Sequence, residues 1–190
     1  MAKPPFNFYA VSGLVDTEPV RQYTSGVQEL DTFIHGGYKD LEENNVTALS
    51  AVFLGNTIVG MYALSSASTQ AISKNKQREL AFGDAGNYNS LPLLSIDHLS
   101  VNEPYQYEST VDHPGLGTAI LRHIFRIVVD LRMDYGVAIA GIIVDSLPGP
   151  VDFYLSRGFV YFNEHEENAI NKETYKLVIS YDKIEKACEL

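Results

Sequence analysis

Short apolar runs, separated by polar or glycine-containing segments, organise most of the chain. Their length and their β-branched and aromatic content are typical of strands. They cover residues 7–14, 48–54, 57–64, 91–101, 137–144, 159–162 and 174–181. Only Gly55-Asn56 separates the run at 48–54 from the run at 57–64. This spacing predicts a hairpin with a tight turn.

Apolar residues at helical spacing predict helices between these strands. Thr24-Ser25-Gly26 offers capping chemistry ahead of a helix over 27–34, which Gly36-Gly37 interrupts before a second helical piece at 38–43. A longer amphipathic helix begins near Ala119, and a short one lies between Pro150 and Gly158. The polar segments 65–89, 102–112 and 163–173 are predicted to be surface excursions or loops.

A strand, a glycine turn, a helix and a strand follow one another from residue 91 to residue 144. This order predicts a parallel βαβ unit, whereas the other strands are joined as antiparallel neighbours. We therefore expect an α+β fold: a mixed, mostly antiparallel sheet with a central parallel strand pair and helices on both faces. The 190 residues fit a single domain, 1–190.

Composition and charge narrow the choice of partners. The formal net charge is −10 and the pI is near 4.8, which makes a nucleic acid partner unlikely and is compatible with an amine substrate. No apolar run has the length of a membrane span, and no signal peptide is recognisable, so a cytoplasmic location is the default expectation. The single cysteine, Cys188, cannot form an internal disulfide.

The stretch Asp112-His113-Pro114-Gly115-Leu116-Gly117-Thr118 opens onto the long helix. Glycines allow a ligand to approach the backbone closely, and a helix start presents unpaired N–H groups that attract phosphate. The stretch alone is equally compatible with an ordinary turn capped by Thr118.

Three motifs in order make the sequence similar to the GNAT superfamily of acetyl-CoA-dependent N-acetyltransferases. They are the strand end Leu99-Ser100-Val101, the turn Gly115-Leu116-Gly117-Thr118-Ala119-Ile120-Leu121, and Phe153-Tyr154-Leu155-Ser156-Arg157-Gly158-Phe159. The segment Ser25 to Ile34 also resembles the branch that includes toxins acetylating aminoacyl-tRNA.

The resemblance implies a GNAT-like sheet, with its parallel strands splayed at the cofactor site, and acetyl-CoA as the co-substrate without a metal. It implies that Tyr154 is the catalytic acid that protonates the leaving thiolate. It further implies a cofactor site made of Leu99, Ser100, Val101, Pro114, Gly115, Leu116, Gly117, Thr118 and Ala119. The N–H groups of Leu116 to Ala119 would hold the pyrophosphate, and the N–H around Val101 would polarise the thioester carbonyl.

One position departs from the family pattern. Asp112 stands where the family usually has Gln or Arg, and Gln106 resembles that residue displaced upstream by an insertion of Tyr107 to Asp112. An aspartate beside a pyrophosphate would be repulsive, which puts the cofactor affinity in question.

The general base is left open. Asp97 and His98 are neighbours on the strand beneath the acetyl group, and alternation directs them to opposite faces. Either one is compatible with a structural hydrogen bond, and a chain of water molecules could replace both.

The leading hypothesis is an N-acetyltransferase that acts on a primary amine of a small molecule or protein. The alternatives are toxin-type acetylation of aminoacyl-tRNA, which the net charge opposes, and a non-catalytic module that binds CoA or a protein partner. The resemblance also admits a homodimer. Substrate selection is expected to come from the first helix and from the segments 65–89 and 163–173.

Overall fold

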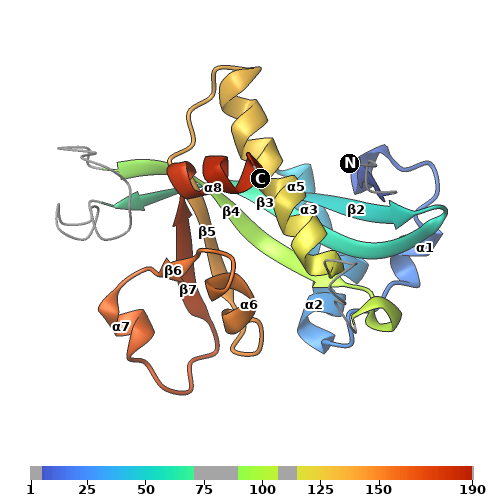
Figure 1. Ribbon diagram of the computed structural model, residues 1–190. Helices are drawn as coiled ribbons and strands as arrows, with labels where there is room; N and C mark the ends of the chain where they lie inside the picture. Colours follow the sequence, from blue (N-terminus) through green and yellow to red (C-terminus); the bar gives the residue numbers. More distant parts are fainter. Residues whose placement is uncertain (1–5, 71–89, 107–114, 190) are drawn as a thin grey trace. The chain divides into compact units, whose positions relative to one another are not determined.

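The computed structural model describes residues 6–70, 90–106 and 115–189 (Figure 1). Its strands form one hydrogen-bonded sheet in the order β1-β2-β3-β4-β5-β7-β6. The pair β4–β5 is parallel, whereas β1–β2, β2–β3, β5–β7 and β6–β7 are antiparallel. The predicted α+β fold, with a mostly antiparallel sheet and a parallel pair, is confirmed. The strands are β1 (Phe6–Ala10), β2 (Ala48–Leu54), β3 (Thr57–Gln70), β4 (Ser90–Val101), β5 (Gly141–Ser146), β6 (Val160–Tyr161) and β7 (Tyr175–Ser180).

Helices connect these strands. In chain order they are η1 (Val11–Gly13), α1 (Glu18–Arg21), α2 (Gln28–Thr32), η2 (Phe33–Gly37), α3 (Tyr38–Glu43), η3 (Glu103–Tyr105), α5 (Leu116–Met133), α6 (Val151–Leu155), α7 (Glu164–Glu167) and α8 (Tyr181–Cys188). In the part of the chain that the structure describes, no helix is both long enough and apolar enough to cross a bilayer.

The contacts divide the chain into two compact units. The first unit contains residues 1–65 and 97–121, and the second contains residues 66–96 and 122–190. The elements β3, β4 and α5 each contribute residues to both units. The expectation of a single domain stays a prediction.

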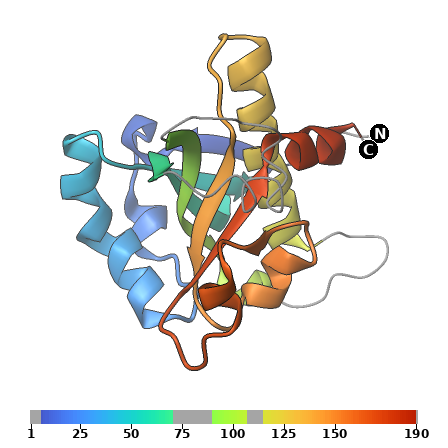
Figure 2. The same ribbon diagram turned by 90° about the vertical axis from the view of Figure 1, so that its left-hand side faces the viewer.

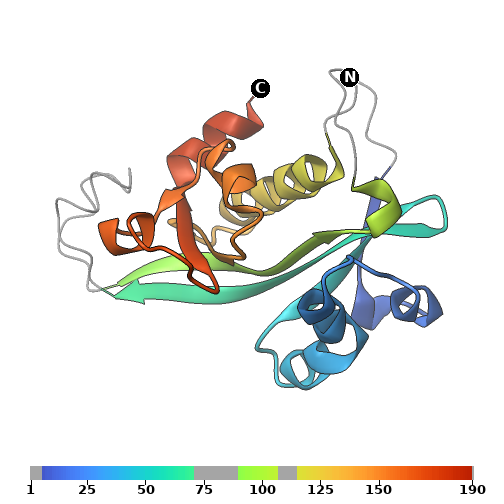
Figure 3. The same ribbon diagram turned by 90° about the horizontal axis from the view of Figure 1, so that it is seen from below.

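In the first unit, α1, α2 and α3 gather on one face of β2 and β3 (Figure 3). Their apolar side chains form a core with the strands, made of Val11, Val20, Tyr23, Ile34, Tyr38, Leu49, Ala51, Ile58, Met61 and Ala63. On β3, a Cβ at Gly60 would collide with Cδ1 of Ile120 and lie 3.1 Å from the Ser100 carbonyl oxygen. Glycine at this position therefore permits the close approach of α5 and β4.

In the second unit, β5 and β7 lie side by side, and β7 leads directly into α8 (Figure 2). The antiparallel ladder runs from Gly141–Ser180 to Ser146–Tyr175. Phe125 on α5 stacks on Phe159 at a centroid distance of 6.2 Å, and Arg132 lies 4.7 Å from the ring centroid of Tyr181. The part of α5 from residue 122 onward and the start of α8 therefore pack within this unit.

One predicted helix boundary is confirmed, and other predicted elements were wrong. Gly36-Gly37 does interrupt the helix that follows Gly26: Gly36 has a φ of 174° and a ψ of −29°, which are not helical, and α3 begins after this kink at Tyr38. The apolar run from Val137 to Ala140 precedes β5 rather than forming it, since the ladder with β7 begins at Gly141. The polar helices α7 and α8 have no counterpart in the prediction.

Candidate active site

The strand β4 changes its alternation midway. Buried side chains fall on odd positions at Leu91 and Leu93 and on even positions at Ile96, His98 and Ser100. The backbone hydrogen bonds show the same change. At the even position Pro92, the carbonyl faces β5 and accepts from the N–H of Ala140. At the even position Asn102, the N–H faces β3 instead and donates to the Val59 carbonyl. The buried face of β4 therefore changes between Leu93 and Ile96, while its pairing with β5 runs without a register shift from Leu93–Gly141 to Ile96–Val144.

Beyond Ile96, one edge of β4 has no strand partner among the described residues. Pairing with β5 ends at Ile96–Val144, within the strand residues that the structure describes. Because Asn102 donates toward β3, alternation directs the N–H groups of Leu99 and Val101 to the opposite edge. These amides can therefore donate to an extended ligand that follows the strand. The splaying of the parallel pair that the resemblance implies stays a prediction.

The start of α5 presents further N–H donors. The amides of Thr118 and Ala119 both donate to the Gly115 carbonyl, at 2.8 and 3.2 Å, so Gly115 closes the first turn. The amides of Leu116 and Gly117, which precede them in the same turn, have no acceptor within the helix. No acidic residue lies in the first turn of α5, and the partial positive charge of the helix start favours an anion there.

The two candidate bases differ in their surroundings. Asp97 accepts hydrogen bonds from the hydroxyls of Thr47 and Ser65, at 2.8 and 3.0 Å. His98 is buried, stacks on Phe33 and shares a 2.7 Å hydrogen bond with the Ser100 hydroxyl. Burial lowers the pKa of His98 to about 4, so its imidazole is neutral at physiological pH. Both side chains have structural partners, and the base stays unassigned.

The hydroxyl of Ser100 also forms a 2.7 Å hydrogen bond with Tyr23. The buried hydrogen-bonded series His98–Ser100–Tyr23 therefore reaches the segment before α2. Burial raises the pKa of Tyr23 above the ordinary value of a phenol, against the opposing effect of the Ser100 hydrogen bond. A serine hydroxyl has one proton and two lone pairs, so Ser100 donates to at most one of these neighbours. No local pattern predicts this contact, because Tyr23 and Ser100 are far apart in the chain.

Gln106 fastens the end of β4 to the same segment. Its side-chain amide donates to the carbonyl oxygens of Val101, at 2.8 Å, and of Ser25. The N–H of Glu103 donates to the Thr24 carbonyl at 2.8 Å. The end of β4 and residues 23–25 are therefore joined by main-chain and side-chain hydrogen bonds. Asp112, the rest of the insertion from Tyr107 and Pro114 lie outside the described residues.

Tyr154 belongs to the second unit and lies on α6, packed among aromatic rings. It is 5% exposed and makes edge contacts with Phe153 and Phe159 at centroid distances of 5.1 and 5.2 Å. Burial raises the pKa of Tyr154, with no hydrogen bond among the described residues to offset it. Its phenol is therefore protonated throughout the physiological range, as a proton donor must be.

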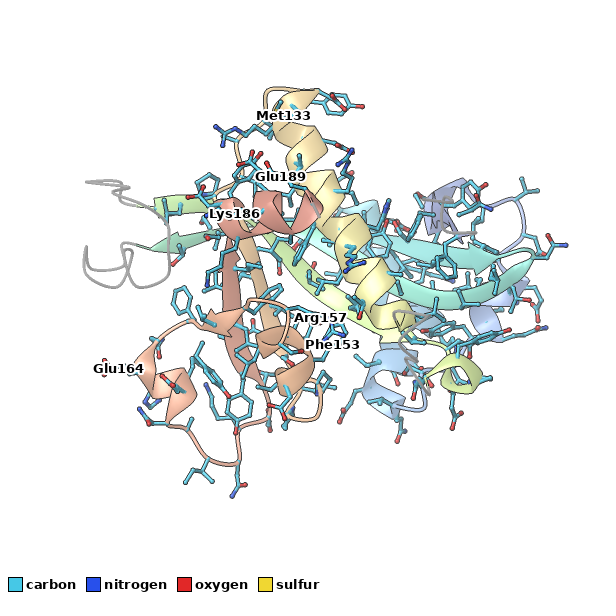
Figure 4. The ribbon with its side chains drawn as sticks, viewed as in Figure 1. Met133, Phe153, Arg157, Glu164, Lys186 and Glu189 are labelled. Atoms are coloured by element: carbon cyan, nitrogen blue, oxygen red, sulfur yellow. The ribbon has the colours of Figure 1, made fainter. Side chains whose placement is uncertain are left out.

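Two arginines of the second unit add positive charge near α6. Arg157 lies over the ring of Phe153, 3.9 Å from its centroid, and donates to the Phe153 carbonyl at 2.7 Å; Figure 4 shows the two side chains together. Burial and then the nearby charge of Arg122 lower the pKa of Arg157. Since guanidinium groups repel each other, this pair favours an anionic ligand.

The predicted site residues thus fall into two groups. Leu99 to Val101 and Gly115 to Ala119 lie in the first unit, and Tyr154 lies in the second. Within the first unit, the sequence missed Tyr23 and the partners of Gln106.

No protein-family model matches the chain, and no similar protein is found among the curated ones. Solved structures do match. A bacterial toxin is 17% identical with a TM-score of 0.76, covering 97% of this chain and 94% of its own. The toxin AtaT in complex with acetyl-methionyl-tRNAfMet is 17% identical with a TM-score of 0.71, covering 96% of this chain and 98% of its own.

A third structure is AtaTR with acetyl-CoA bound, at 16% identity and a TM-score of 0.70, covering 96% of this chain and 97% of its own. These likenesses span nearly the whole chain. The protein therefore has the fold of these toxins, and the resemblance found in the sequence is confirmed at the level of the fold.

Proposed function

We propose that the protein is an acetyl-CoA-dependent N-acetyltransferase that acts on a primary amine. The observation that carries the proposal is the free edge of β4, where the Leu99 and Val101 amides point away from β3 in a unit that also holds the start of α5. Support comes from the shared fold with a structure that contains acetyl-CoA. The two sets of amides suit the amide-containing arm and the pyrophosphate of acetyl-CoA.

In this proposal, the end of β4, the start of α5 and Tyr154 have different chemical roles. The amides of Leu116 and Gly117 hold the pyrophosphate. The neutral amine attacks the thioester carbon, a C–N bond forms, and the Val101 amide donates to the resulting oxyanion. The C–S bond then breaks, Tyr154 gives its proton to the thiolate, and the proton lost by the amine returns to the phenolate through water. The products are an amide and free CoA.

The acceptor that we favour is the amino acid of a charged tRNA. Support comes from the likeness to the AtaT complex with acetyl-methionyl-tRNAfMet and from the Arg122–Arg157 pair beside α6. The net charge of −10 opposes this choice, and it favours a second candidate, a primary amine on a small molecule or a protein. A local basic pair can bind phosphate on a protein that is acidic overall, so we rank the tRNA first.

The test offers the purified protein acetyl-CoA with one acceptor at a time. The acceptors are a mixture of charged tRNAs, the same tRNAs without amino acid, and a panel of small amines and lysine peptides. Release of CoA is followed with a thiol reagent, and the acetylated product is identified by mass spectrometry. We expect turnover with the charged tRNAs alone. Turnover only with small amines or peptides would select the second candidate, and none with any acceptor would contradict the proposal.

A further inference from the structure

A cavity of about 750 Å³ opens in the first unit, between the segment before α2 and the η2 turn. Every lining residue is polar or glycine: Thr24, Gly26, Gln28, Asp31, Thr32, His35, Gly36 and Gly37. Its volume lies within the usual range for sites that bind small molecules. The polar side chains of the lining suit a ligand with several hydrogen-bonding groups. The sequence did not predict this cavity.

The lining contains hydrogen-bond acceptors rather than cations. The Asp31 carboxylate accepts from the Ser25 amide, the Ser25 hydroxyl and the Thr24 hydroxyl, each at 2.7 Å. Burial raises the pKa of Asp31, but these hydrogen bonds outweigh it and hold the pKa below its ordinary value. Asp31 is therefore a carboxylate at physiological pH, and it disfavours a phosphate in the cavity.

His35 lines the cavity together with Asp31. Its Nε2 lies 2.8 Å from the Tyr23 carbonyl oxygen, which can only accept, so Nε2 carries a proton. This hydrogen bond holds the imidazole ring in place. A ligand that donates from an amino group matches the Asp31 carboxylate.

The wall of the cavity is joined to the end of β4. Thr24 lines the cavity and accepts from the Glu103 amide, while Gln106 bridges the neighbouring Ser25 carbonyl to that of Val101. The cavity and the Val101 amide thus belong to one hydrogen-bonded piece of the first unit.

We propose that this cavity receives the amine-bearing end of the acceptor, an amino acid esterified to a ribose, with the Asp31 carboxylate accepting hydrogen bonds from its amino group and the ring of His35 forming part of the wall. The inference rests on the proposed function and specifies its acceptor site. It assigns the phosphates of a tRNA to another surface, because the cavity carries a carboxylate.

A variant that fills the cavity tests the inference. Gly37 has helical backbone angles, φ −61° and ψ −25°, and a Cβ there would make only ordinary contacts, 3.5 Å from the Thr32 carbonyl oxygen and 3.9 Å from Phe33. Gly37→Leu therefore adds a side chain to the lining with little strain. Gly13→Leu is the matched control, since a Cβ at Gly13 meets nothing within 4 Å and Gly13 does not line the cavity.

Binding is measured by calorimetry with an aminoacyl nucleoside in which an amide replaces the ester, so the probe is stable and no catalysis is needed. We expect saturable binding to the unmodified protein, a loss of at least about tenfold in affinity for Gly37→Leu, and less than about twofold for Gly13→Leu. Equal binding by both variants, or no binding by the unmodified protein, would overturn the inference.

Steady-state kinetics separate this inference from the proposed function. If the cavity holds the acceptor, Gly37→Leu raises the KM for charged tRNA and leaves the KM for acetyl-CoA within about twofold. An unchanged acceptor KM, in a protein that does transfer acetyl groups, would overturn the acceptor site alone. A protein that binds the nucleoside but transfers no acetyl group would contradict the proposed function and leave the cavity as a nucleoside site.

Discussion

Tyr23 and Tyr154 are the same residue in different settings. Both are nearly inaccessible, at 1% and 5% exposure, and burial raises the pKa of both. The Tyr23 hydroxyl forms a 2.7 Å hydrogen bond with Ser100, whose hydroxyl is also hydrogen-bonded to His98. Tyr154 is enclosed by the rings of Phe153 and Phe159, and its hydroxyl bonds to no described residue.

The contrast teaches that burial and a raised pKa do not identify a catalytic phenol. The two tyrosines differ in whether the hydroxyl already has a hydrogen-bond partner inside the protein. Removing a hydroxyl that has such a partner takes a hydrogen bond away from a buried group, whereas removing one without a partner costs little stability. A pair of Tyr→Phe variants therefore separates structure from catalysis.

The largest effect is expected on the rate of Tyr154→Phe. Loss of a positioned acid typically lowers a rate by about 10²- to 10⁴-fold. We expect such a decrease in kcat, with the KM for acetyl-CoA nearly unchanged, in assays of CoA release. The matched Tyr23→Phe variant is expected to lose less than about tenfold. Similar losses in both variants would remove the distinction between the two tyrosines.

The next effect is the pH dependence of stability that arises from His98, which is hydrogen-bonded through Ser100 to Tyr23. The pKa of His98 falls to about 4 in the folded protein, so between pH 6.5 and 4 the unfolded chain binds a proton that the folded chain does not. Stability therefore falls as the pH is lowered through this window, by an amount on the order of 3 kcal/mol. Urea unfolding at a series of pH values measures it.

His98→Gln is the control for this pH effect. Glutamine keeps a hydrogen-bonding group near Ser100 and does not titrate. Its stability is expected to depend less on pH between 6.5 and 5, and the remaining dependence comes from His123, whose pKa burial also lowers. The carboxylates Asp31 and Glu166, whose pKa values are lowered, act at more acidic pH. An unchanged pH dependence in His98→Gln would show that another group is responsible.

A smaller effect is expected on the stability of Tyr23→Phe. It leaves the buried Ser100 hydroxyl with one partner fewer, at a cost of about 1–3 kcal/mol. Tyr154→Phe removes a hydroxyl without a described partner, and we expect a change within about 0.5 kcal/mol. Chemical unfolding of both variants at pH 7.5 gives the two values. The reverse order would mean that Tyr154 is the structural residue.

The smallest effect concerns the charge of the second unit. Arg122 is exposed, and if it contacts phosphate, Arg122→Gln raises the KM for charged tRNA by about threefold to tenfold and weakens its salt dependence. The KM for an unphosphorylated aminoacyl nucleoside is expected to stay constant. Equal changes with both acceptors would point to a general loss of activity instead.

Much of the fold could be predicted because the signals are local. Gly55-Asn56 does join β2 to β3, with Gly55 at a φ of 61°, and the order of elements around α5 predicted the parallel pair. The helix α8 was missed because charged residues follow Tyr181 and the preceding apolar run ends there. Its helical face becomes visible only once Ile184 is known to be buried.

The site was predicted less completely, because its geometry depends on distant contacts. The motifs assign Val101, Gly115 and Tyr154 to the site, and this assignment stays a prediction. They could not reveal the shift in alternation between Leu93 and Ile96, since the residues around it are apolar on both faces. The cavity depends on the kink at Gly36, which the sequence predicted, and on hydrogen bonds that join Asp31 to Ser25, which no spacing in the sequence predicts.

The most direct test of the account is a calorimetric titration of the unmodified protein and of Tyr154→Phe with acetyl-CoA, followed by a turnover assay on the same samples. The account predicts saturable binding of similar affinity by both proteins, and acetyl transfer by the unmodified protein alone. The absence of saturable heat with the unmodified protein, or full turnover by Tyr154→Phe, would contradict it.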